Sequence, residues 1–557
     1  MKKALPFSVL DRSSQLRTLQ SERFDLVVIG GGITGAGIAL DAASRGLRTV
    51  LLEKGDFASG TSSKSTKLIH GGLRYLKQFD FWLVKEVGSE RAIVHQLAPH
   101  LVLPEKMLLP LIEGGSYGKW LTSFGLKVYD LLAQVGGDDR RRMLEKEEAL
   151  KKEPLLPDEE LLGAGYYAEY RTDDARLTLE NIKTSLQFGA LALNYTRVEG
   201  FLRDADGQVS GVKARDLLGE EDVEIQADFV INAAGPWVDN LRTLDGSRKG
   251  KRLHLTKGVH LVFPREKLPV RQSIYFDVPD GRMIFAIPRG KVTYVGTTDT
   301  DYEGETDEVR TDLADAVYLV AAVNHMFPTI ELELADIESS WAGLRPLIHE
   351  EGKSASEMSR KDEIFTSETG LISIAGGKLT GYRKMAERAV NRVARQLEEA
   401  GRALEACRTD RIPLCGNDFP DFAGVKAYAK KVALRLEPHG FDTGRTWELV
   451  TTYGAQTDQI LSLFEAHPDP DPVWGLLRAE LEFGMAHEMV TSPADFFIRR
   501  TGSLYFDIGT VRKYLQPAAE VCAAGLGADR GQAEAWVREL EDAIRIHSDF
   551  DPEHMAD

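Results

Sequence analysis

The chain has 557 residues, of which 43% are hydrophobic and 28% are charged, and its formal net charge is −17. This length predicts two or three domains rather than one core. The acidic balance argues against nucleic acid as a partner, because binding a phosphate backbone requires a broad positive surface, although a small anionic ligand needs only a local cluster of Arg and Lys.

The cysteines are too few and too widely spaced for a disulfide framework or a cysteine-based metal site: they are Cys407, Cys415 and Cys522. They therefore predict a reducing compartment and no metal. The first residues, MKKALPFSVLDRSS, contain a short apolar run with Pro6 inside it, so no secretory signal peptide is predicted. The sequence has no run of 18 or more apolar residues, so we expect no membrane-spanning helix and a cytoplasmic location.

The first predicted elements form a strand–helix–strand unit. FDLVVI at 24–29 is apolar and β-branched, which predicts a buried strand. Small and apolar residues predict a helix over 33–45 that Gly46 closes, and RTVLLE at 48–53 predicts a second buried strand. This order predicts the βαβ unit of a Rossmann-like nucleotide-binding domain.

A glycine cluster with the spacing G-x-G-x-x-G joins the first strand to the helix. Gly30 would permit a tight turn, Gly32 would let the backbone approach a pyrophosphate, and Gly35 would let the helix pack on the strand. Glu53 ends the second strand, where an acid binds ribose hydroxyls. The pattern predicts a dinucleotide site, and FAD and NAD both use it.

A polar loop, GDFASGTSSKSTKLIHGG at 55–72, follows this unit. A nicotinamide enzyme would usually continue with further regular βα units, so the loop favours a large cofactor lying over it. Its Ser and Thr hydroxyls would donate to phosphate groups and ring edges. The alternative is an ordinary solvated loop.

The rest of the chain divides into a β-rich middle and a helical tail. ADFVINAAG at 227–235 predicts a buried strand, and VHLVFP, RMIFAIPRG and KVTYVGTTD predict a β-rich stretch after it. The segment 370–401 predicts a strand, a glycine turn and a long helix. Ser492 begins a further helix with a cap residue, a proline and an acid. Other tail helices are expected near 422–437, 446–466, 474–490 and 532–546.

Five motifs together resemble one family. VVIGGGITGAGIALDAASRGLRTVLLEK, TSSKSTKLIHGGLRYL, VINAAGPWVD, WAGLRPL and IAGGKLTGYRKMAE resemble the FAD-dependent glycerol-3-phosphate dehydrogenases, within the D-amino-acid-oxidase-like flavoproteins. The resemblance implies an α/β fold with a discontinuous FAD-binding domain, an inserted antiparallel-sheet substrate domain and an all-helical C-terminal domain. The expected boundaries are 20–95, 165–245 and 350–402 for the first, 96–164 and 246–349 for the second, and 403–557 for the third.

The same resemblance implies a reaction. It is oxidation of sn-glycerol 3-phosphate to dihydroxyacetone phosphate by hydride transfer to FAD, with electrons passed on to quinone. A glycerol-3-phosphate oxidase, which reduces dioxygen to hydrogen peroxide, is the main alternative. An amino-acid or amine oxidase and a non-catalytic flavin-binding regulator are the others.

Four residues carry over as substrate-binding residues on this resemblance: Arg74, Tyr75, Arg345 and Lys378. Arg345 and Lys378 are also predicted to be catalytic, because their fixed positive charge would hold the phosphate and favour a developing alkoxide. His260, on a predicted strand, is the simplest base for the hydroxyl proton. A structural histidine is the alternative reading of the same position.

Glycines also mark the predicted flavin contacts. Gly71 and Gly72 would let the backbone pass close to the flat ring, and Gly376 and Gly377 would present amide donors ahead of a helix that contains Lys378. The full set of predicted FAD contacts is Gly30, Gly32, Ile33, Thr34, Gly35, Glu53, Lys54, Thr61, Ser62, Ser63, Lys67, Leu68, His70, Gly71, Gly72, Ala233, Ala234, Gly235, Trp237, Gly376, Gly377, Lys378, Leu379 and Thr380.

A quinone acceptor would require contact with a bilayer surface. KWLTSFGLKVYDLL at 119–132 has apolar residues at helical spacing and a basic flank, which is typical of an interfacial helix on the inner face of the cell membrane. A helix packed on the substrate domain explains the same pattern. The helical tail is expected to pack internally, with homodimer contacts as a further expectation.

Overall fold

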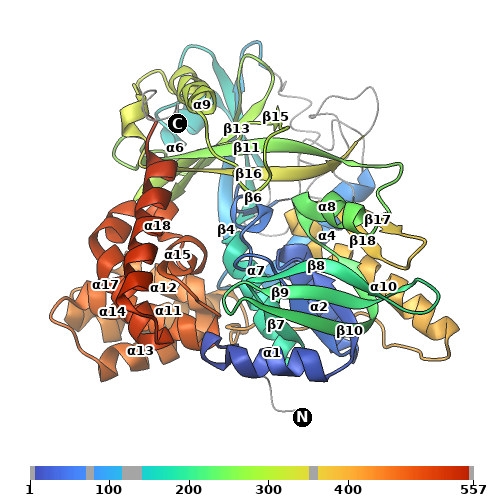
Figure 1. Ribbon diagram of the computed structural model, residues 1–557. Coiled ribbons are helices and arrows are strands. Elements are labelled where there is room, and N and C mark those ends of the chain that lie inside the picture. Colours follow the sequence, from blue (N-terminus) through green and yellow to red (C-terminus); the bar gives the residue numbers. More distant parts are fainter. Residues whose placement is uncertain (1–6, 71–80, 116–140, 350–361, 551–557) are drawn as a thin grey trace.

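The computed structural model describes residues 7–70, 81–115, 141–349 and 362–550. Figure 1 shows three parts: a sheet with helices at lower right, a second sheet above it, and the orange and red C-terminal helices on the left. This arrangement confirms the predicted fold class of an α/β cofactor domain, a β-rich domain and a helical C-terminal domain.

The first sheet contains the predicted strand–helix–strand unit. Its order is β17-β18-β10-β1-β2-β7, and neighbouring strands are parallel from β18 to β7, whereas β17 is antiparallel to β18. The long strand β10 also pairs with β9, which pairs with β8. The bounds are β1 (Phe24–Ile29), β2 (Thr49–Leu52), β7 (Leu191–Leu193), β8 (Thr196–Arg203), β9 (Val209–Asp216), β10 (Glu221–Asn232), β17 (Asp362–Thr366) and β18 (Ile372–Gly376).

Both faces of the first sheet are covered. Leu26 and Val28 of β1 pack in one core with helices α2, α7 and α10, and Val27 and Ile29 pack in another with α1 and strands β8 and β9. Because a parallel strand is buried on both faces, β1 is apolar without interruption from Leu26 to Ile29. The helix bounds are α1 (Arg12–Ser21), α2 (Ile33–Ser44), α7 (Asp174–Gln187) and α10 (Tyr382–Glu399).

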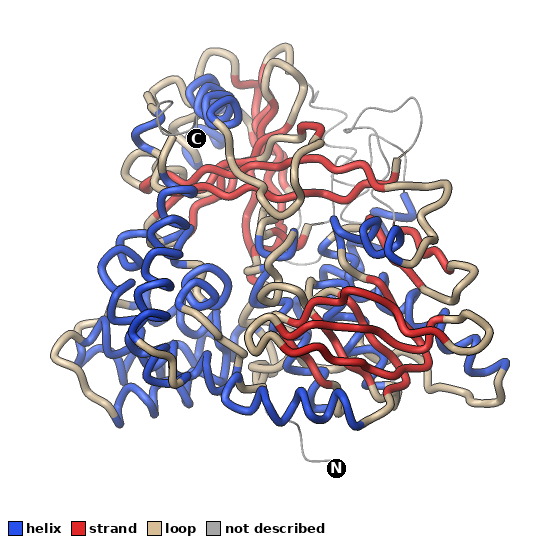
Figure 2. Tube along the Cα trace, in the orientation of Figure 1, coloured by secondary structure: helices blue, strands red, loops and turns tan. Residues whose placement is uncertain are grey.

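The second sheet is mainly antiparallel, as the resemblance implies, and Figure 2 shows its strands in red above the first sheet. Its order is β15-β11-β14-β13-β12-β4-β6-β3, with β16 paired to β11 and β5 to β6; β4 and β12 run parallel. The bounds are β3 (Leu68–Ile69), β4 (Leu103–Ile112), β5 (Arg142–Leu144), β6 (Leu161–Arg171), β11 (Leu253–Pro264), β12 (Ser273–Asp277), β13 (Met283–Arg289), β14 (Val292–Gly296), β15 (Thr300–Asp301) and β16 (Ser339–Ile348).

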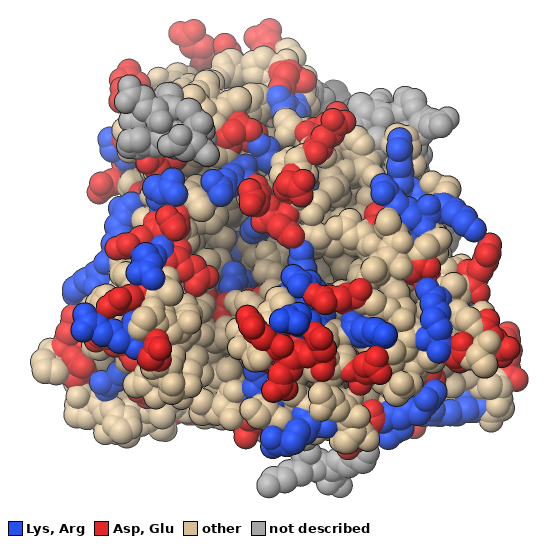
Figure 3. All heavy atoms as spheres, viewed as in Figure 1, with Lys and Arg blue, Asp and Glu red and all other residues tan. Residues whose placement is uncertain are grey.

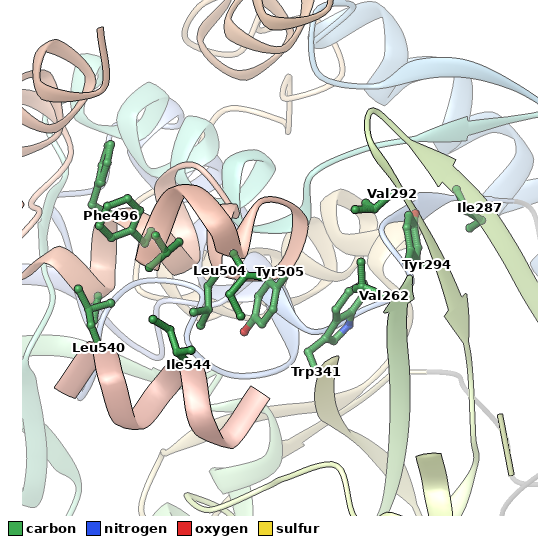
Figure 4. Packing of buried hydrophobic residues seen from close by; sticks show 14 of the residues in the cluster. Val262, Ile287, Val292, Tyr294, Trp341, Phe496, Leu504, Tyr505, Leu540 and Ile544 are labelled. Carbon is green, nitrogen blue, oxygen red and sulfur yellow. The ribbon is translucent and has the colours of Figure 1, made fainter. Parts of the chain in front are cut away.

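Two hydrophobic cores cover the two faces of the second sheet. Leu261 of β11 packs in the core that includes helix α9, whereas its neighbour Val262 lies in the core shared with the C-terminal helices. Figure 4 shows Trp341 of this second core between the sheet and the helices that carry Tyr505 and Ile544. The C-terminal helices therefore pack directly on this sheet. Within the described ranges, the other α-helices outside the tail are α4 (Phe81–Leu97), α6 (Lys146–Lys152), α8 (Val238–Leu244) and α9 (Leu313–Met326).

The C-terminal part departs from the prediction at two places. The single helix expected at 446–466 is wrong: two helices are separated by a turn at Gly454, whose φ of 57° lies outside the helical region. A long helix, α17, was not predicted, and it accommodates Pro517 in its interior. Ser492 caps a helix, α15, as predicted. This helix ends at Asp495, and a π-helical turn, η9 (Phe496–Arg500), follows it directly. The bounds are α11 (Phe422–Leu436), α12 (Thr443–Tyr453), α13 (Thr457–Ala466), α14 (Pro472–His487), α15 (Pro493–Asp495), α16 (Ser503–Phe506), α17 (Ile508–Leu526) and α18 (Arg530–Ser548).

The sheets show how the predicted domain segments are distributed. Strands of the first sheet fall within 20–95, 165–245 and 350–402. The strand β6 passes through the expected boundary at residue 164, and β3, inside the first expected segment, belongs to the second sheet. The exact boundaries remain a prediction.

Candidate functional site

The front of the molecule is hollowed between the C-terminal helices and the two sheets, with acidic and basic side chains interspersed around the hollow (Figure 3). A cavity of about 330 Å³ lies where the first sheet meets the polar loop after β2 and the end of β16. This volume is in the range of small-molecule and cofactor sites. The predicted cofactor contacts that line it are Gly30, Gly32, Ile33, Thr34, Glu53, Lys54, Thr61, Ser62, Ala233, Ala234, Gly235, Trp237, Gly376, Gly377, Lys378 and Leu379.

The glycine turn after β1 is a close-packed cradle. Gly30 has a φ of 112°, and a Cβ atom there would lie 2.6 Å from the carbonyl oxygen of Ala233. A Cβ at Gly35 would collide with the carbonyl oxygen of Gly30, so α2 reaches the turn only because side chains are missing. Gly32 faces Ser62 and lines the cavity. Gly30 thus forms the tight turn and Gly35 allows the close helix packing that the sequence predicted, whereas the approach of Gly32 to a pyrophosphate stays a prediction.

Glu53 at the end of β2 lines the cavity and closes the turn. The backbone N–H of Gly31 donates to its Oε2 at 2.7 Å, and that of Gly55 donates to its Oε1 at 2.9 Å. Burial raises the pKa of Glu53, against the lowering effect of these two N–H groups. Its carboxylate thus fixes both the glycine turn and the start of the polar loop, and its predicted contact with a ribose stays a prediction.

The polar loop connects the two sheets across the cavity. The hydroxyl of Thr61 donates to the carbonyl oxygen of Leu344 on β16 at 2.7 Å. The hydroxyl of Ser62 accepts from the N–H of Ile33, the first residue of α2, at 2.9 Å. Ser63 is buried next to them but does not line the cavity. The loop is therefore a structured wall rather than a solvated connection.

The side chain of Lys67 contacts the polar loop and α7 and does not line the cavity. Its Nζ lies 2.5 Å from Oδ1 of Asp174 on α7 and donates to the carbonyl oxygen of Ser63 at 3.0 Å. The side chain is 3% exposed and does not line the cavity, and Leu68, the next residue in β3, is also buried. These contacts brace the loop against α7.

The glycine turn after β18 joins this loop through the carbonyl group of His70. Nζ of Lys378 donates to that oxygen at 2.7 Å, and Oγ1 of Thr380 donates to it at 3.1 Å. Gly376 and Gly377 both have positive φ, of 76° and 90°. The predicted helix from Lys378 onward is wrong in its start: a 3-10 turn covers Leu379–Gly381, and α10 begins afterwards.

Arg345 lies in a recess of the second sheet. Its Nη1 donates to the carbonyl oxygen of Thr298 at 3.1 Å and to Oδ1 of Asp299 at 3.2 Å, and its Nη2 donates to Oγ1 of Thr297 at 2.8 Å. The next residue, Pro346, lines the cavity. The three contacts hold the guanidinium in a fixed position, and Arg345 itself does not line the cavity.

His260 on β11 has the surroundings of a packing residue. Its ring stacks on Trp341 with centroids 4.7 Å apart and planes at 12°, and its Nε2 lies 2.9 Å from Oγ1 of Thr66. Burial, helped by the charges of Arg345 and Lys67, holds the pKa of His260 well below its usual range. The imidazole is therefore neutral near pH 7, and it does not line the cavity. The geometry favours the structural alternative.

Some predicted residues lie outside the described residues. They are Gly71, Gly72, Arg74 and Tyr75, together with the segment 119–132.

The cavity also includes residues that the sequence reading missed. Thr196, Arg197 and Val198 of β8 line it, and no short motif marks them. Trp237 was predicted, but its partners were not: Nζ of Lys54 lies 4.2 Å from its ring centroid, and a Cβ at Gly60 would be 2.9 Å from Cζ3 of Trp237. Lys54, Gly60 and Trp237 therefore pack together at the cavity wall.

The lining fits FAD by its chemistry. The buried indole N–H of Trp237 has no hydrogen-bond partner among the described residues, so it can donate to a ligand. The lining is mainly apolar and also contains glycine backbone, hydroxyl groups and one carboxylate. This combination suits a ligand that has phosphates, ribose and flat rings.

Comparison with known proteins agrees with this reading. Residues 25–383 match the family model of FAD dependent oxidoreductases, and residues 407–533 match that of the C-terminal domain of alpha-glycerophosphate oxidase. An aerobic glycerol-3-phosphate dehydrogenase of Bacillus subtilis is 49% identical over 91% of this chain and 92% of that protein.

Two solved structures are also similar to the chain. A glycerol-3-phosphate dehydrogenase of Bacillus halodurans, complexed with FAD, matches with a TM-score of 0.83 and 43% identity over 98% of this chain and 99% of that one. An L-alpha-glycerophosphate oxidase of Mycoplasma pneumoniae with FAD bound has a TM-score of 0.54 and 19% identity over 70% of this chain and 97% of that one, a likeness of fold alone. The chain therefore belongs to the FAD-dependent oxidoreductases and, among them, to the family of the aerobic glycerol-3-phosphate dehydrogenases.

Proposed function

We propose that the chain is an FAD-dependent dehydrogenase that oxidises sn-glycerol 3-phosphate to dihydroxyacetone phosphate in glycerol catabolism. The observation that carries the proposal is near-complete coverage of dehydrogenases of that name at close to half identity, 49% for the Bacillus subtilis protein. The cavity supports it, because the segments predicted to hold FAD meet there.

In this proposal FAD occupies the cavity and, when bound, supplies the acceptor for the hydride that leaves the second carbon of the substrate. The amides and missing side chains of Gly30 and Gly32 receive the pyrophosphate at the start of α2. Glu53 would bind the ribose. Trp237 and the glycines at 376–377, which line the cavity, would form walls for the ring systems.

The substrate's phosphate dianion would be held by cations beside the cavity. Arg345 on β16 and Lys378 after β18 belong to segments whose strands contact each other, and we propose that both charges act on the phosphate. A guanidinium offers two donors to a phosphate, and an ammonium adds a point charge. Arg74 and Tyr75, outside the described residues, complete the proposed substrate set.

His260 is poorly suited to act as the base for the hydroxyl proton. His260 can accept a proton because it is neutral, but its low pKa makes it a weak base, and its ring is engaged by Trp341 and Thr66. We therefore propose that His260 packs the second sheet beneath Arg345.

An anaerobic titration of the purified holoprotein tests the reaction. Glycerol 3-phosphate should bleach the flavin absorbance, and glycerol should not, because it lacks the phosphate that the cations bind. Bleaching by an amino acid but not by the phosphate ester would instead identify an amino-acid or amine oxidase. A flavin that no substrate bleaches would indicate a non-catalytic flavin-binding regulator.

For the electron acceptor we propose quinone, reached by peripheral contact with the inner face of the cell membrane. Among the described residues, no helix is both long and apolar enough to cross a membrane. Dioxygen is the second candidate, because the tail matches the C-terminal domain of alpha-glycerophosphate oxidase. A reduced enzyme that is reoxidised by a soluble quinone much faster than by air would support the dehydrogenase, and rapid formation of stoichiometric peroxide in air would support the oxidase. Homodimer formation also remains a proposal, which sedimentation of the holoprotein can test.

A further inference from the structure

Asp56 is a buried carboxylate in the polar loop, three residues after Glu53. It is 2% exposed, and both of its oxygens are occupied. Arg500 donates to Oδ2 at 2.6 Å through Nη1 and to Oδ1 at 2.8 Å through Nη2. Nε of Arg499 also donates to Oδ2, and Nδ2 of Asn194 donates to Oδ1 at 3.1 Å. Two guanidinium groups of the C-terminal domain therefore hold one carboxylate of the cofactor loop.

The two arginines are themselves fixed within the C-terminal domain. Both belong to the π-helical turn η9, an irregularity that proteins often use at functional sites. Nη2 of Arg499 donates to Oδ1 of Asp495 at 2.7 Å, and Nη2 of Arg500 donates to the carbonyl oxygen of Glu488 at 2.8 Å. The hydroxyl of Tyr195, at the end of the first sheet, donates to the same Asp495 oxygen at 2.6 Å.

Asp56 lies between two contacts that shape the cavity wall. Just before it, the N–H of Gly55 donates to Glu53. Just after it, the N–H of Ala58 donates to the carbonyl oxygen of Gly31 at 3.0 Å, and Ala58 has a positive φ of 62°. Residues 59–62, which follow, line the cavity. A movement of Asp56 would therefore move both the glycine turn and the loop.

The attraction between opposite charges keeps Asp56 bound to Arg499 and Arg500 near neutral pH. Burial acts to raise the pKa of Asp56, but the charges and hydrogen bonds of Arg500 and Arg499 outweigh it and lower the pKa to about 2. The carboxylate is therefore ionised near pH 7. A buried carboxylate with two arginines tolerates little displacement, because each separation leaves a buried charge unpaired.

We propose that Arg499 and Arg500 position the FAD-binding loop through Asp56, so that the C-terminal domain sets the affinity for FAD without contacting it. The inference rests on the proposed placement of FAD in the cavity. Asp56, Arg499 and Arg500 are positioning residues in this account, and they take no part in the reaction.

The test compares full-length holoproteins with Asp56→Asn, Arg499→Gln and Arg499→Lys. Arg445→Gln is the control, because Arg445 forms a part-buried ion pair with Glu480 inside the C-terminal domain, away from the loop. All proteins are measured at a temperature at which circular dichroism shows them folded. Three quantities are measured: the dissociation constant of FAD, hydrogen–deuterium exchange of residues 53–66, and kcat with saturating FAD.

Asp56→Asn and Arg499→Gln should raise the FAD dissociation constant about tenfold, within the usual scale of coupling between linked sites, and should speed exchange in 53–66. With saturating FAD, kcat and the KM for glycerol 3-phosphate should stay close to the wild-type values. For Arg499→Lys, the FAD dissociation constant and the exchange in 53–66 should lie between those of the wild type and Arg499→Gln, since lysine keeps the charge but loses the second donor. Arg445→Gln should lower thermal stability but should change neither the FAD dissociation constant nor the exchange in 53–66.

Unchanged FAD affinity and unchanged exchange in folded Asp56→Asn would overturn the proposal, as would an equal loss of affinity in Arg445→Gln. If Asp56→Asn does not fold, the two Arg499 variants decide the question alone. The placement of FAD is tested separately in the wild-type protein, where added FAD should slow exchange in 53–66. Absence of protection in 53–66 would reject the placement, whatever the variants show.

Discussion

The guanidinium group of Arg345 lies against the backbone of Gly258, where a Cβ atom would fall 2.5 Å from Nη1 and 2.6 Å from Cζ. Gly258 is on β11, which pairs with the strand β16 that carries Arg345. The missing side chain thus creates the recess in which Arg345 meets Thr297 and Asp299. Because the guanidinium is the flexible end of its side chain, a larger residue at 258 would displace it without breaking the strand.

Gly258→Ala should therefore move the positive charge of Arg345 without removing it. We expect the variant to fold and keep its flavin, while kcat/KM for glycerol 3-phosphate falls about 10- to 150-fold, the value of one or more hydrogen bonds to a charged group. Steady-state kinetics and the flavin spectrum measure the two effects. Gly200→Ala is the control, because a Cβ in that strand position meets only ordinary contacts, the nearest 3.7 Å away. Wild-type kinetics in Gly258→Ala would remove Arg345 from the substrate site.

His260→Gln distinguishes packing from base catalysis. We expect the free energy of unfolding to fall by about 1–3 kcal/mol, because the stack on Trp341 and the bond with Thr66 are lost or weakened. The value of kcat should be largely retained. Loss of a general base would instead lower kcat by about 10²- to 10⁴-fold and change the pH dependence of the rate. Denaturant unfolding and a pH–rate profile of the same variant give both readouts.

Thr61→Val tests the bond between the cofactor loop and the second sheet. The valine keeps the volume of threonine but cannot donate to the carbonyl oxygen of Leu344, which is 2.7 Å from Oγ1. Loss of a hydrogen bond that contributes about 1 kcal/mol should raise the FAD dissociation constant about fivefold. The increase in flavin fluorescence on dilution measures it. Thr451→Val, whose hydroxyl bonds only within its own helix, should leave FAD binding unchanged.

A buried histidine should make the fold sensitive to acid. His100 is fully buried, and burial, with the charges of Arg176 and Lys183, lowers its pKa to about 3. Between about pH 6.5 and 3 the unfolded chain binds a proton at this position that the folded chain does not. Stability is therefore lost as the pH falls through this window, by about 1.4 kcal/mol per pH unit.

His100→Gln should flatten this dependence. Urea unfolding of the wild-type protein and the variant at pH 7 and pH 5 measures the difference, and the variant should lose less stability over that interval. Both ring nitrogens of His100 have no hydrogen-bond partner among the described residues, so the variant breaks no bond seen there. Parallel pH dependences would show that the proton is taken up elsewhere.

The glycine turn could be predicted from local sequence alone. The spacing of Gly30, Gly32 and Gly35, the apolar run before them and Glu53 after them are local constraints, because a turn, a helix start and two parallel strands use residues close in the chain. The structure has β1, α2 and β2 within a residue or two of the predicted bounds. The motifs after β10 and β18 were found for the same reason, and they converge on the same cavity.

The groups that hold these local motifs in place depend instead on long-range contacts of the fold. Asp56 and Arg499 are 443 positions apart, and no pattern near either residue predicts that they meet. The recess at Gly258 likewise exists because β11 pairs with β16, and the stack of His260 on Trp341 follows from the same pairing. Local sequence sets backbone conformation through sterics and hydrogen bonding between near neighbours. Long-range charge pairs and the orientation of side chains depend on which surfaces the whole fold brings together.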